Sequence, residues 1–365
     1  MSDPGPAART PAVRKGQGST TLSRAEFEAR WRMQFHDPAF EQVPEALERA
    51  LAVAWDAYEQ YRKSPRTVKA GPEFANPDAD LALEWVEARR AVQAAAAAHD
   101  DPAGDTRLLL ICGSPRSDET CPGEMSKTFR LLQHARAVLA QAGSYDLDVL
   151  DLSVLTSEYG RRIFPCKACV STAMPLCHWP CSCYPNHAMG QVQDWMHEIY
   201  PRWVAAHAVL IVTPVHWYQA PSALKLMIDR LVCADGGNPD PTTTDGKSPE
   251  KAKALELQGW PYPRHLAGRA FGVIVHGDAA GADTVRRSLH DWLADMGLEP
   301  AGSLALVDRY VGYYEPYATS HDALDGDEAL FAEVANAART LGEAASRVRA
   351  GRHQAGAALT EPRPK

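Results

Sequence analysis

The chain has 365 residues, of which 45% are hydrophobic and 23% are charged, with a formal net charge of −8. This is the composition of an ordinary globular protein, and it excludes a low-complexity or collagen-like chain. The acidic balance provides no basic surface of the kind that binds nucleic acid, so we expect no nucleic-acid partner. No apolar run approaches the ~18 residues of a membrane span, so we expect no membrane partner either.

Residues 1–37 begin with a polar stretch, MSDPGPAARTPAVRKGQGSTTLSR, without the apolar core of a secretory signal. We expect this segment to be disordered and the protein to be cytoplasmic. In that compartment the eight cysteines should be reduced, redox-active or metal-bound rather than paired in structural disulfides.

Residues 38–104, called here the N-terminal extension, have a helical pattern. Apolar side chains recur at helical spacing at Leu47, Leu51 and Trp55, and again at Leu81 and Trp85. We therefore expect a helical extension that packs on the main domain or on a second subunit.

Between residues 105 and 312 short apolar runs alternate with helical stretches, which predicts an α/β domain with a parallel sheet covered on both faces. We expect a doubly wound, five-stranded sheet in the order 2-1-3-4-5, followed by a C-terminal helix and tail over 313–365. The predicted strands are 107–112, 147–152, 208–213, 270–276 and 302–307, and the predicted helices lie near 126–142, 188–204, 220–233, 282–297 and 327–349.

A long polar loop, GSPRSDETCPGEMSKT, separates the first strand from the first helix of this domain. Free N–H groups and the dipole at a helix N-terminus bind phosphate, and the loop adds hydroxyl and cationic side chains. A simpler reading is that Ser126 only caps the helix. The candidate anion ligands are Ser114, Arg116, Ser126, Lys127 and Thr128.

The loop after the third strand, PVHWYQ, should lie at the same edge, because ligands of open parallel sheets bind where the strand order reverses. Aromatic side chains are not required to bind a phosphate, but they suit the binding of a planar ring. The alternative is that these aromatic side chains only cover the edge of the core. The glycines of HGDAAGAD, after the fourth strand, permit close approach to a ligand. Phosphate and a flat ring together describe flavin mononucleotide (FMN). The candidate contacts are Pro214, Val215, His216, Trp217, Tyr218, Gly277 and Asp278.

These motifs resemble those of the NAD(P)H-dependent FMN reductase family of the flavodoxin-like superfamily, over about residues 105–310. GSPRSDETCPGEMSKT is similar to the family's phosphate loop, although it is longer, and TPVHWYQAPSALKLMIDR is similar to its flavin-ring motif. Lys127 stands where the family often has Asn. The resemblance implies a flavodoxin-like fold, phosphate contacts from Ser114, Arg116, Ser126 and Thr128, and ring contacts from the backbone of Pro214 to Tyr218.

Residues 166–187, CKACVSTAMPLCHWPCSCYPNH, are called here the cysteine segment and hold five of the eight cysteines. Relatives of the family, the iron–sulfur flavoproteins, carry a tighter set of cysteines after the second strand. Three readings stay open: an iron–sulfur cluster or zinc site, a redox or disulfide-forming set, and unligated thiols. The candidate ligands are Cys166, Cys169, Cys177, Cys181 and Cys183.

Residues 234–269, called here the insertion, are too long for a plain connection. We expect the insertion to act as a mobile lid that shapes the acceptor pocket over its own flavin or over that of a partner subunit. The aromatic stretch RYVGYYEPYATSH, 309–321, would form the opposite wall.

Together these features predict an oxidoreductase that passes hydride from NADPH or NADH through FMN to a quinone, a flavin or another small acceptor. His216 is a candidate for proton supply, or it only stacks on the ring. The alternatives are an electron-transfer flavoprotein serving a protein partner and a metal-stabilised, noncatalytic interaction module. We also expect a homodimer or homotetramer.

Overall fold

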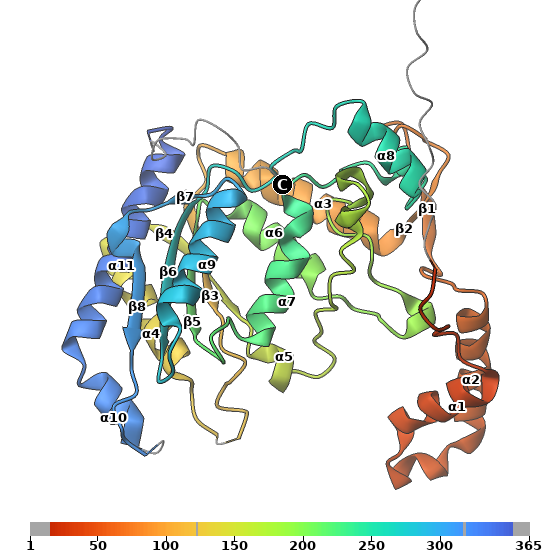
Figure 1. Cartoon of the computed structure of the whole chain (residues 1–365), viewed down its shortest axis with the longest axis horizontal. Coiled ribbons are helices and arrows are strands. Elements are labelled where there is room, and N and C mark those ends of the chain that lie inside the picture. The colour runs from red at the N-terminus through yellow and green to blue at the C-terminus, as the bar shows by residue number, and fades with distance from the viewer. Residues whose placement is uncertain (1–14, 122, 317–318, 353–365) are drawn as a thin grey trace, which may run out of the picture.

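The structure is a computed structural model and describes residues 15–121, 123–316 and 319–352 (Figure 1). Its centre is a parallel sheet in the order β4-β3-β5-β6, and both β7 and β8 pair with β6. This is the predicted doubly wound α/β class, and the order is 2-1-3-4-5 with the fifth place shared by two short strands. The strands are β3 Thr106–Cys112, β4 Tyr145–Asp151, β5 Ala208–Pro214, β6 Ala270–Gly277, β7 Glu299–Pro300 and β8 Leu306–Tyr310.

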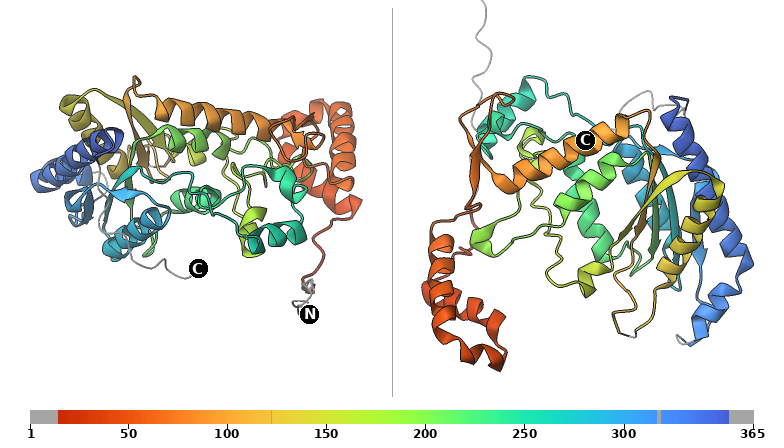
Figure 2. Two further views of the ribbon diagram at one scale, coloured as in Figure 1. Left: turned by 90° about the horizontal axis from the view of Figure 1, so that it is seen from above. Right: turned by 180° about the vertical axis from the view of Figure 1, so that it is seen from behind.

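Helices cover both faces of the sheet (Figure 2). Successive side chains of a strand point to opposite faces, and accordingly Leu109 and Ile111 enter one core while Leu108 and Leu110 enter the other. All four are fully buried, which explains why the strands are apolar without interruption. One core is covered by α6 Met196–Ala205, α7 Ser222–Arg230 and α9 Ala282–Asp295, and the other by α4 Lys127–Ala142 and α11 Glu328–Arg349.

The prediction of a fifth strand over 302–307 was wrong. Residues Ser303–Ala305 form a 3-10 helix, and strand pairing resumes only at Leu306. Pro300 has no N–H to donate to a ladder, and Gly302 has a φ of +153°, so the backbone leaves the sheet here. The predicted helix over 188–204 starts later, at Met196, and helix α10, Ser320–Asp325, was missed.

The N-terminal part is more ordered and less purely helical than expected. Residues 1–14 lie outside the described residues, but the expectation of disorder was wrong for α1, whose Ser23 and Glu26 form a capping box. Phe27 packs on Trp55 and Tyr58, with ring centroids 5.5 and 4.7 Å apart. The elements are α1 Arg24–Arg32, 3-10 turns Met33–Phe35 and Pro38–Gln42, α2 Pro44–Glu59, the antiparallel pair β1 Thr67–Lys69 and β2 Asp80–Ala82, and α3 Leu83–Asp100.

The N-terminal extension, the cysteine segment and the insertion pack together beside the sheet (Figure 1). Trp85 Nε1 donates to the Pro180 carbonyl at 2.9 Å, and the Trp179 N–H donates to the Asn238 carbonyl at 2.8 Å. The cysteine segment contains the 3-10 turns Cys169–Ser171 and Met174–Leu176, and the insertion contains the 3-10 turn Pro241–Thr244 and α8 Pro249–Leu257. The remaining short elements are α5 Val154–Ser157 and the 3-10 turns His187–Met189 and Leu231–Ala234.

The insertion is therefore not a mobile lid over its own flavin. Asn238, Thr242 and Thr244 are 1%, 6% and 0% exposed, so its polar half is buried rather than loose. Helix α7 runs away from the carboxyl edge of the sheet and delivers the insertion to the opposite end, where α8 lies in Figure 1. The sequence missed this because the partners of the buried threonines and asparagine are remote in the chain.

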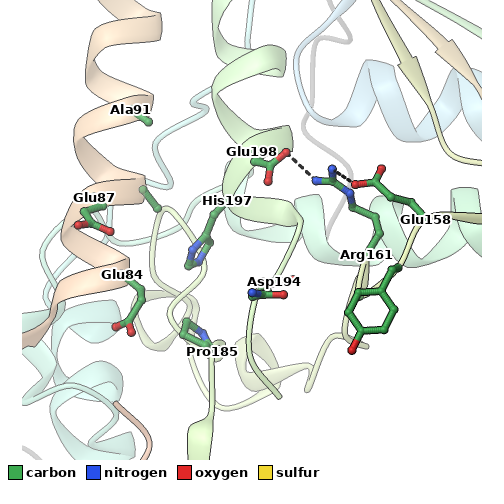
Figure 3. A pocket seen from close by; sticks show the side chains of 13 residues that line it. Glu84, Glu87, Ala91, Glu158, Arg161, Pro185, Asp194, His197 and Glu198 are labelled. Carbon is green, nitrogen blue, oxygen red and sulfur yellow. Dashed lines mark hydrogen bonds and ion pairs between the residues drawn. The ribbon is translucent and has the colours of Figure 1, made fainter. Parts of the chain in front are cut away.

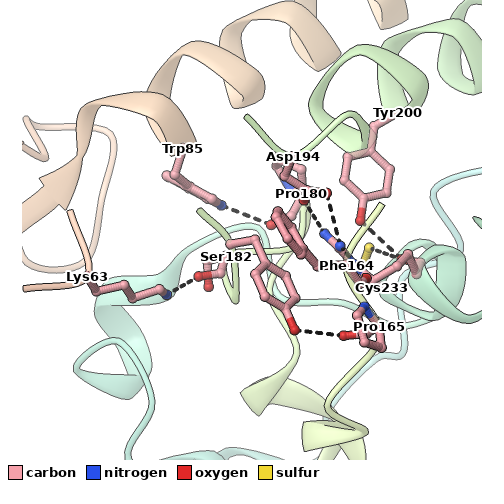
Figure 4. A network of polar contacts seen from close by, with 11 residues as sticks. Lys63, Trp85, Phe164, Pro165, Pro180, Ser182, Asp194, Tyr200 and Cys233 are labelled. Atoms are coloured by element: carbon pink, nitrogen blue, oxygen red, sulfur yellow. Dashed lines mark hydrogen bonds and ion pairs between the residues drawn. The ribbon is translucent and has the colours of Figure 1, made fainter. Parts of the chain in front are cut away.

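A buried ion pair ties α7 to the end of the segment that precedes α6 (Figure 4). Arg230 and Asp194 both have fully buried side chains, and Arg230 Nη2 lies 2.5 Å from Asp194 Oδ2. Arg230 Nη1 also donates to the Phe164 carbonyl at 2.9 Å, and its guanidinium lies 4.8 Å from the ring centroid of Tyr184. Asp194 compensates the charge, and both terminal nitrogens of the guanidinium have acceptors, whereas Nε has no hydrogen-bond partner among the described residues.

Replacing Asp194 with Asn should lower the free energy of unfolding by about 3–5 kcal/mol, because it leaves the buried Arg230 charge without its counter-ion. The matched control is Asp229→Asn on α7, which removes the exposed i,i+4 partner of Lys225 and should cost about 0.5 kcal/mol or less. Urea unfolding of both variants measures the difference. Equal losses in the two variants would contradict the assignment.

Among the described residues, no helix combines the length and the apolar character that a membrane crossing requires.

Candidate active site

Three loops meet at the carboxyl edge of the sheet, after β3, β5 and β6. The parallel register aligns Cys112 with Val212 and Pro214 with His276, so the three strands end at the same level. The Gly113 N–H donates to the Val212 carbonyl at 2.8 Å, and the Val215 N–H donates to the His276 carbonyl at 2.9 Å. The structure thus brings together the loops that carry the predicted cofactor contacts.

The first loop presents buried hydroxyl groups around the start of α4. Ser114, Ser126 and Thr128 are only 4%, 5% and 1% exposed. Ser126 is the N-cap, and its Oγ accepts from the Phe129 N–H at 3.1 Å. Capping uses a lone pair of Ser126 and leaves its proton available, so the capping role does not exclude anion binding. Buried donors at a helix N-terminus form a suitable place for a phosphate.

Two cations add positive potential to this loop. Lys127 follows Ser126, and burial lowers the pKa of its ammonium, although Asp278 and Glu124 oppose the shift. Arg116 lies close enough to Lys127 to contribute to the same lowering of the pKa. Two like charges held near each other, beside buried donors, favour a bound anion.

The second loop is a tight turn that exposes two aromatic side chains. His216 and Gln219 exchange N–H to carbonyl hydrogen bonds, both of 2.9 Å. Trp217 and Tyr218 between them have φ values of +46° and +64°, a left-handed conformation that costs non-glycine residues of order 1–3 kcal/mol each. Trp217 is 93% exposed and Tyr218 is 60% exposed, so neither covers the core as the simpler reading proposed.

Two glycines allow the loops to approach one another. A Cβ on Gly113 would lie 2.7 Å from Thr213 Oγ1, and a Cβ on Gly277 would lie 2.6 Å from Val215 Cγ1. Both distances are shorter than real contacts allow, so any side chain at either position would push the strand ends apart.

The aromatic stretch 309–321 lies beside the third loop, although Tyr317 lies outside the described residues. The Val311 N–H donates to the Gly277 carbonyl at 2.9 Å. Tyr310 and Tyr314 are 55% and 93% exposed. The carboxyl edge therefore carries exposed aromatic side chains on two sides.

The sequence reasoning missed His276, the last polar residue of β6. It is 4% exposed, and its Nε2 lies 2.9 Å from Thr128 Oγ1. Burial lowers the pKa of His276 to about 3, with a smaller contribution from Lys127, so the ring is neutral. Within the described part of the chain its Nδ1 has no hydrogen-bond partner. The signal was a histidine ending an otherwise apolar strand, AFGVIVH.

His276 can set the direction of the Thr128 hydroxyl. Because buried N–H groups without an acceptor are rare, we assign the proton to Nε2 rather than to Nδ1. Nε2–H then donates to Thr128 Oγ1. The Thr128 proton is left free to point toward an anion at the start of α4. The same neutral ring also avoids adding a second buried charge.

Within the described residues the His216 ring has no such hydrogen-bond partner, and partial burial lowers its pKa while Asp278 opposes the shift. A neutral imidazole beside the turn can accept or donate a proton through either ring nitrogen.

The cysteine segment forms no metal site in the described residues. No group of three or more His, Cys, Asp or Glu side chains is arranged to hold a metal ion in that part of the chain. The expectation of an iron–sulfur cluster or zinc is therefore not supported. All eight cysteines are free, and four of the five in the cysteine segment contact one another instead. This leaves the redox and unligated readings.

A separate cavity of about 530 Å³ lies between α3 and α6 (Figure 3). Its lining includes Glu84 and His197, and Arg161 bridges the carboxylates of Glu158 and Glu198 at 2.5 and 2.8 Å. None of the candidate flavin contacts lines it, so it is distinct from the carboxyl-edge site.

The fold is that of a flavodoxin-like protein, a class that binds a mononucleotide at the switch point of the sheet. Residues 106–310 match the family described as NADPH-dependent FMN reductase, which is more than half of the chain. The chain belongs to the NADPH-dependent FMN reductase family. It is an NAD(P)H-dependent flavoprotein oxidoreductase that uses FMN.

Solved structures with a similar chain course include RosB with a bound 8-demethyl-8-formylriboflavin-5'-phosphate intermediate, at 13% identity over 68% of this chain and 81% of that one, with a TM-score of 0.47. An apo NADH:FMN oxidoreductase matches at 13% identity over 70% and 92%, with a TM-score of 0.36. An NAD(P)H:quinone oxidoreductase from Methanothermobacter marburgensis matches at 16% identity over 66% and 98%, also with a TM-score of 0.36. No curated protein matches the chain. The family assignment rests on the family match alone.

Replacing His276 with Leu should weaken FMN binding by about 1 kcal/mol, roughly fivefold in Kd, because Thr128 loses the donor that orients it. His276→Gln keeps an N–H near the Nε2 position and should lose less. In a Thr128→Val background, the Leu substitution should add little. Fluorescence titration of the apoprotein with FMN measures all of these. Equal and additive losses would instead show that His276 acts only through packing.

Proposed function

We propose that this chain holds FMN with its phosphate at the start of α4 and its ring beside residues 214–218, and reduces a quinone, a free flavin or another small acceptor. The observation that carries this proposal is the meeting of three loops at one edge. One loop has buried hydroxyls and two cations, and the other two flank exposed aromatics. The residues present fit FMN because buried hydroxyl donors and two cations lie together at the start of α4, where a phosphate is held.

When bound, FMN accepts hydride from NADPH or NADH and passes reducing equivalents to the acceptor. The chain's own residues bind FMN and orient it. Ser114, Ser126 and Thr128 donate hydrogen bonds to the phosphate, and Arg116 and Lys127 balance its charge. The backbone of the Pro214–Tyr218 turn positions the ring, and the left-handed conformations of Trp217 and Tyr218 define the shape of this turn.

His216 is our candidate for proton supply, because its ring belongs to the turn that flanks the flavin position and its pKa lies below the ordinary value. The neutral ring relays a proton: its unprotonated nitrogen takes a proton from solvent, and the imidazolium then gives a proton to the reduced acceptor and returns to the neutral form.

We further propose that the chain assembles as a homodimer or homotetramer. Exposed apolar side chains support this, since Met33 and Val53 of the N-terminal helices are 66% and 67% exposed. Light scattering of the purified protein measures the mass directly.

The function is tested with FMN-loaded protein under anaerobic conditions. Addition of NADPH should bleach the flavin absorption bands, and a quinone or free flavin added next should restore them over repeated turnovers. His216→Asn should retain FMN and bleaching but slow the step that restores the bands. A flavin that NADPH does not bleach would contradict the proposal.

Replacing Arg116 with Ala should weaken FMN binding by about 1.5–3 kcal/mol, or roughly ten- to hundredfold, through loss of a charge-assisted hydrogen bond. Riboflavin, which lacks the phosphate, should bind the wild type and the variant equally. The matched control is Arg136→Ala on the exposed face of α4, which removes the same charge away from the helix start. An unchanged Kd for FMN in Arg116→Ala would show that this arginine does not contact the phosphate.

A further inference from the structure

Four thiols of the cysteine segment form a contact chain away from the carboxyl edge. Cys177 and Cys183 are the neighbours that most affect the pKa of Cys169, and Cys183 is the one that most affects the pKa of Cys181, so the four thiols lie near one another. Cys169 Sγ also lies 3.8 Å from the carbonyl oxygen of Leu176, the residue before Cys177. Cys169 therefore lies beside the Leu176–Cys177 peptide and is the member with two neighbouring thiols.

Two lysines from other parts of the chain reach this cluster. Lys247 Nζ, from the insertion, lies 3.7 Å from Cys169 Sγ and donates to the Leu176 carbonyl at 2.8 Å. Lys63, from the N-terminal extension, donates to the carbonyl of Ser182 (Figure 4). Thus all three segments that pack beside the sheet supply a group to the thiol cluster, and the charges of Lys247 and Lys63 come from outside the cysteine segment.

The cysteines differ in access. Cys177, Cys181 and Cys183 are buried, at 3%, 7% and 8% exposure, whereas Cys169 is only partly buried. An oxidant from solvent can therefore reach Cys169 first, and Cys177 is the buried thiol next to it. The other buried thiols, Cys112 and Cys233, lie on strand β3 and after α7 and are fully buried.

We propose that Cys169 and Cys177 are an oxidisable thiol pair, a second redox site outside the flavin site, and that a small hydroperoxide is the oxidant. The Cys169 sulfur attacks a peroxide oxygen, forms an S–O bond and breaks the O–O bond, which releases an alcohol or water. The Cys177 sulfur then attacks the Cys169 sulfur, forms the disulfide and expels water. In total, two thiols and one hydroperoxide give one disulfide, one alcohol or water, and one water, so two electrons pass from sulfur to the peroxide.

The surroundings favour a slow, selective reaction over a fast one. The Lys247 ammonium favours the thiolate of Cys169, but the contact with Cys177 outweighs it and raises the pKa of Cys169. We therefore expect stoichiometric oxidation without rapid turnover. This inference does not depend on the acceptor proposed for the flavin.

The test counts thiols in the full-length protein in a Cys121→Ser background, because Cys121 is exposed and could react between molecules. One equivalent of hydrogen peroxide should lower the thiol count after denaturation from seven to five, and dithiothreitol should restore it. Peptide mapping should find a Cys169–Cys177 link. An unchanged count overturns the proposal, as does a protein that is purified with a stoichiometric metal bound to these thiols.

Variants separate this pair from a general loss of thiols. Cys169→Ser should abolish the loss of two thiols, and Cys177→Ser should leave Cys169 as a sulfenic acid that dimedone traps. Cys183→Ser is the control and should still lose two thiols. If Cys183→Ser abolishes the loss while Cys177→Ser does not, the assigned pair is wrong. Circular dichroism and bound FMN show whether each variant is folded, and a misfolded Cys169→Ser can be replaced by Cys169→Ala.

Discussion

The parallel pairing of β3 with β5 is the constraint on which the site depends. These strands are neighbours in the sheet, yet α4 and α7, which follow them, cover opposite faces. The two loops must diverge from the carboxyl edge, which leaves a crevice there. Gly113 and Gly277 then hold the loop starts close, and the Arg230–Asp194 pair anchors the far end of α7. The phosphate and ring contacts that we propose follow from these positions.

The parallel sheet could be predicted from local sequence, because uninterrupted apolar runs such as RLLLIC are typical of strands in a sheet that is covered on both faces. The loop after β3 was predicted to bind an anion because polar residues precede the start of a helix. Both signals are local in the sequence. The apolar runs indicate burial of the strands, and the polar loop indicates an anion site through the free N–H groups of a helix N-terminus.

The rest depends on contacts between residues that are far apart in the chain. His276 gains a role only because Thr128, 148 residues earlier, lies beside it. The insertion seemed mobile because its composition is polar, but Asn238 and Thr244 find buried partners in the cysteine segment. The prediction of a fifth strand over 302–307 was wrong because Pro300 and Gly302 interrupt strand pairing in a stretch whose apolar pattern is otherwise typical of a strand. The local sequence pattern does not indicate contacts between residues that are far apart in the chain.

The central claim is that FMN lies across this crevice with its phosphate at the start of α4. A crystal structure of the FMN complex tests it most directly. In that complex the phosphate oxygens should lie within hydrogen-bonding distance of the Ser126 and Thr128 hydroxyls and of the Lys127 N–H, with the ring beside the Pro214–Tyr218 turn. A phosphate found elsewhere, such as in the cavity between α3 and α6, would contradict it.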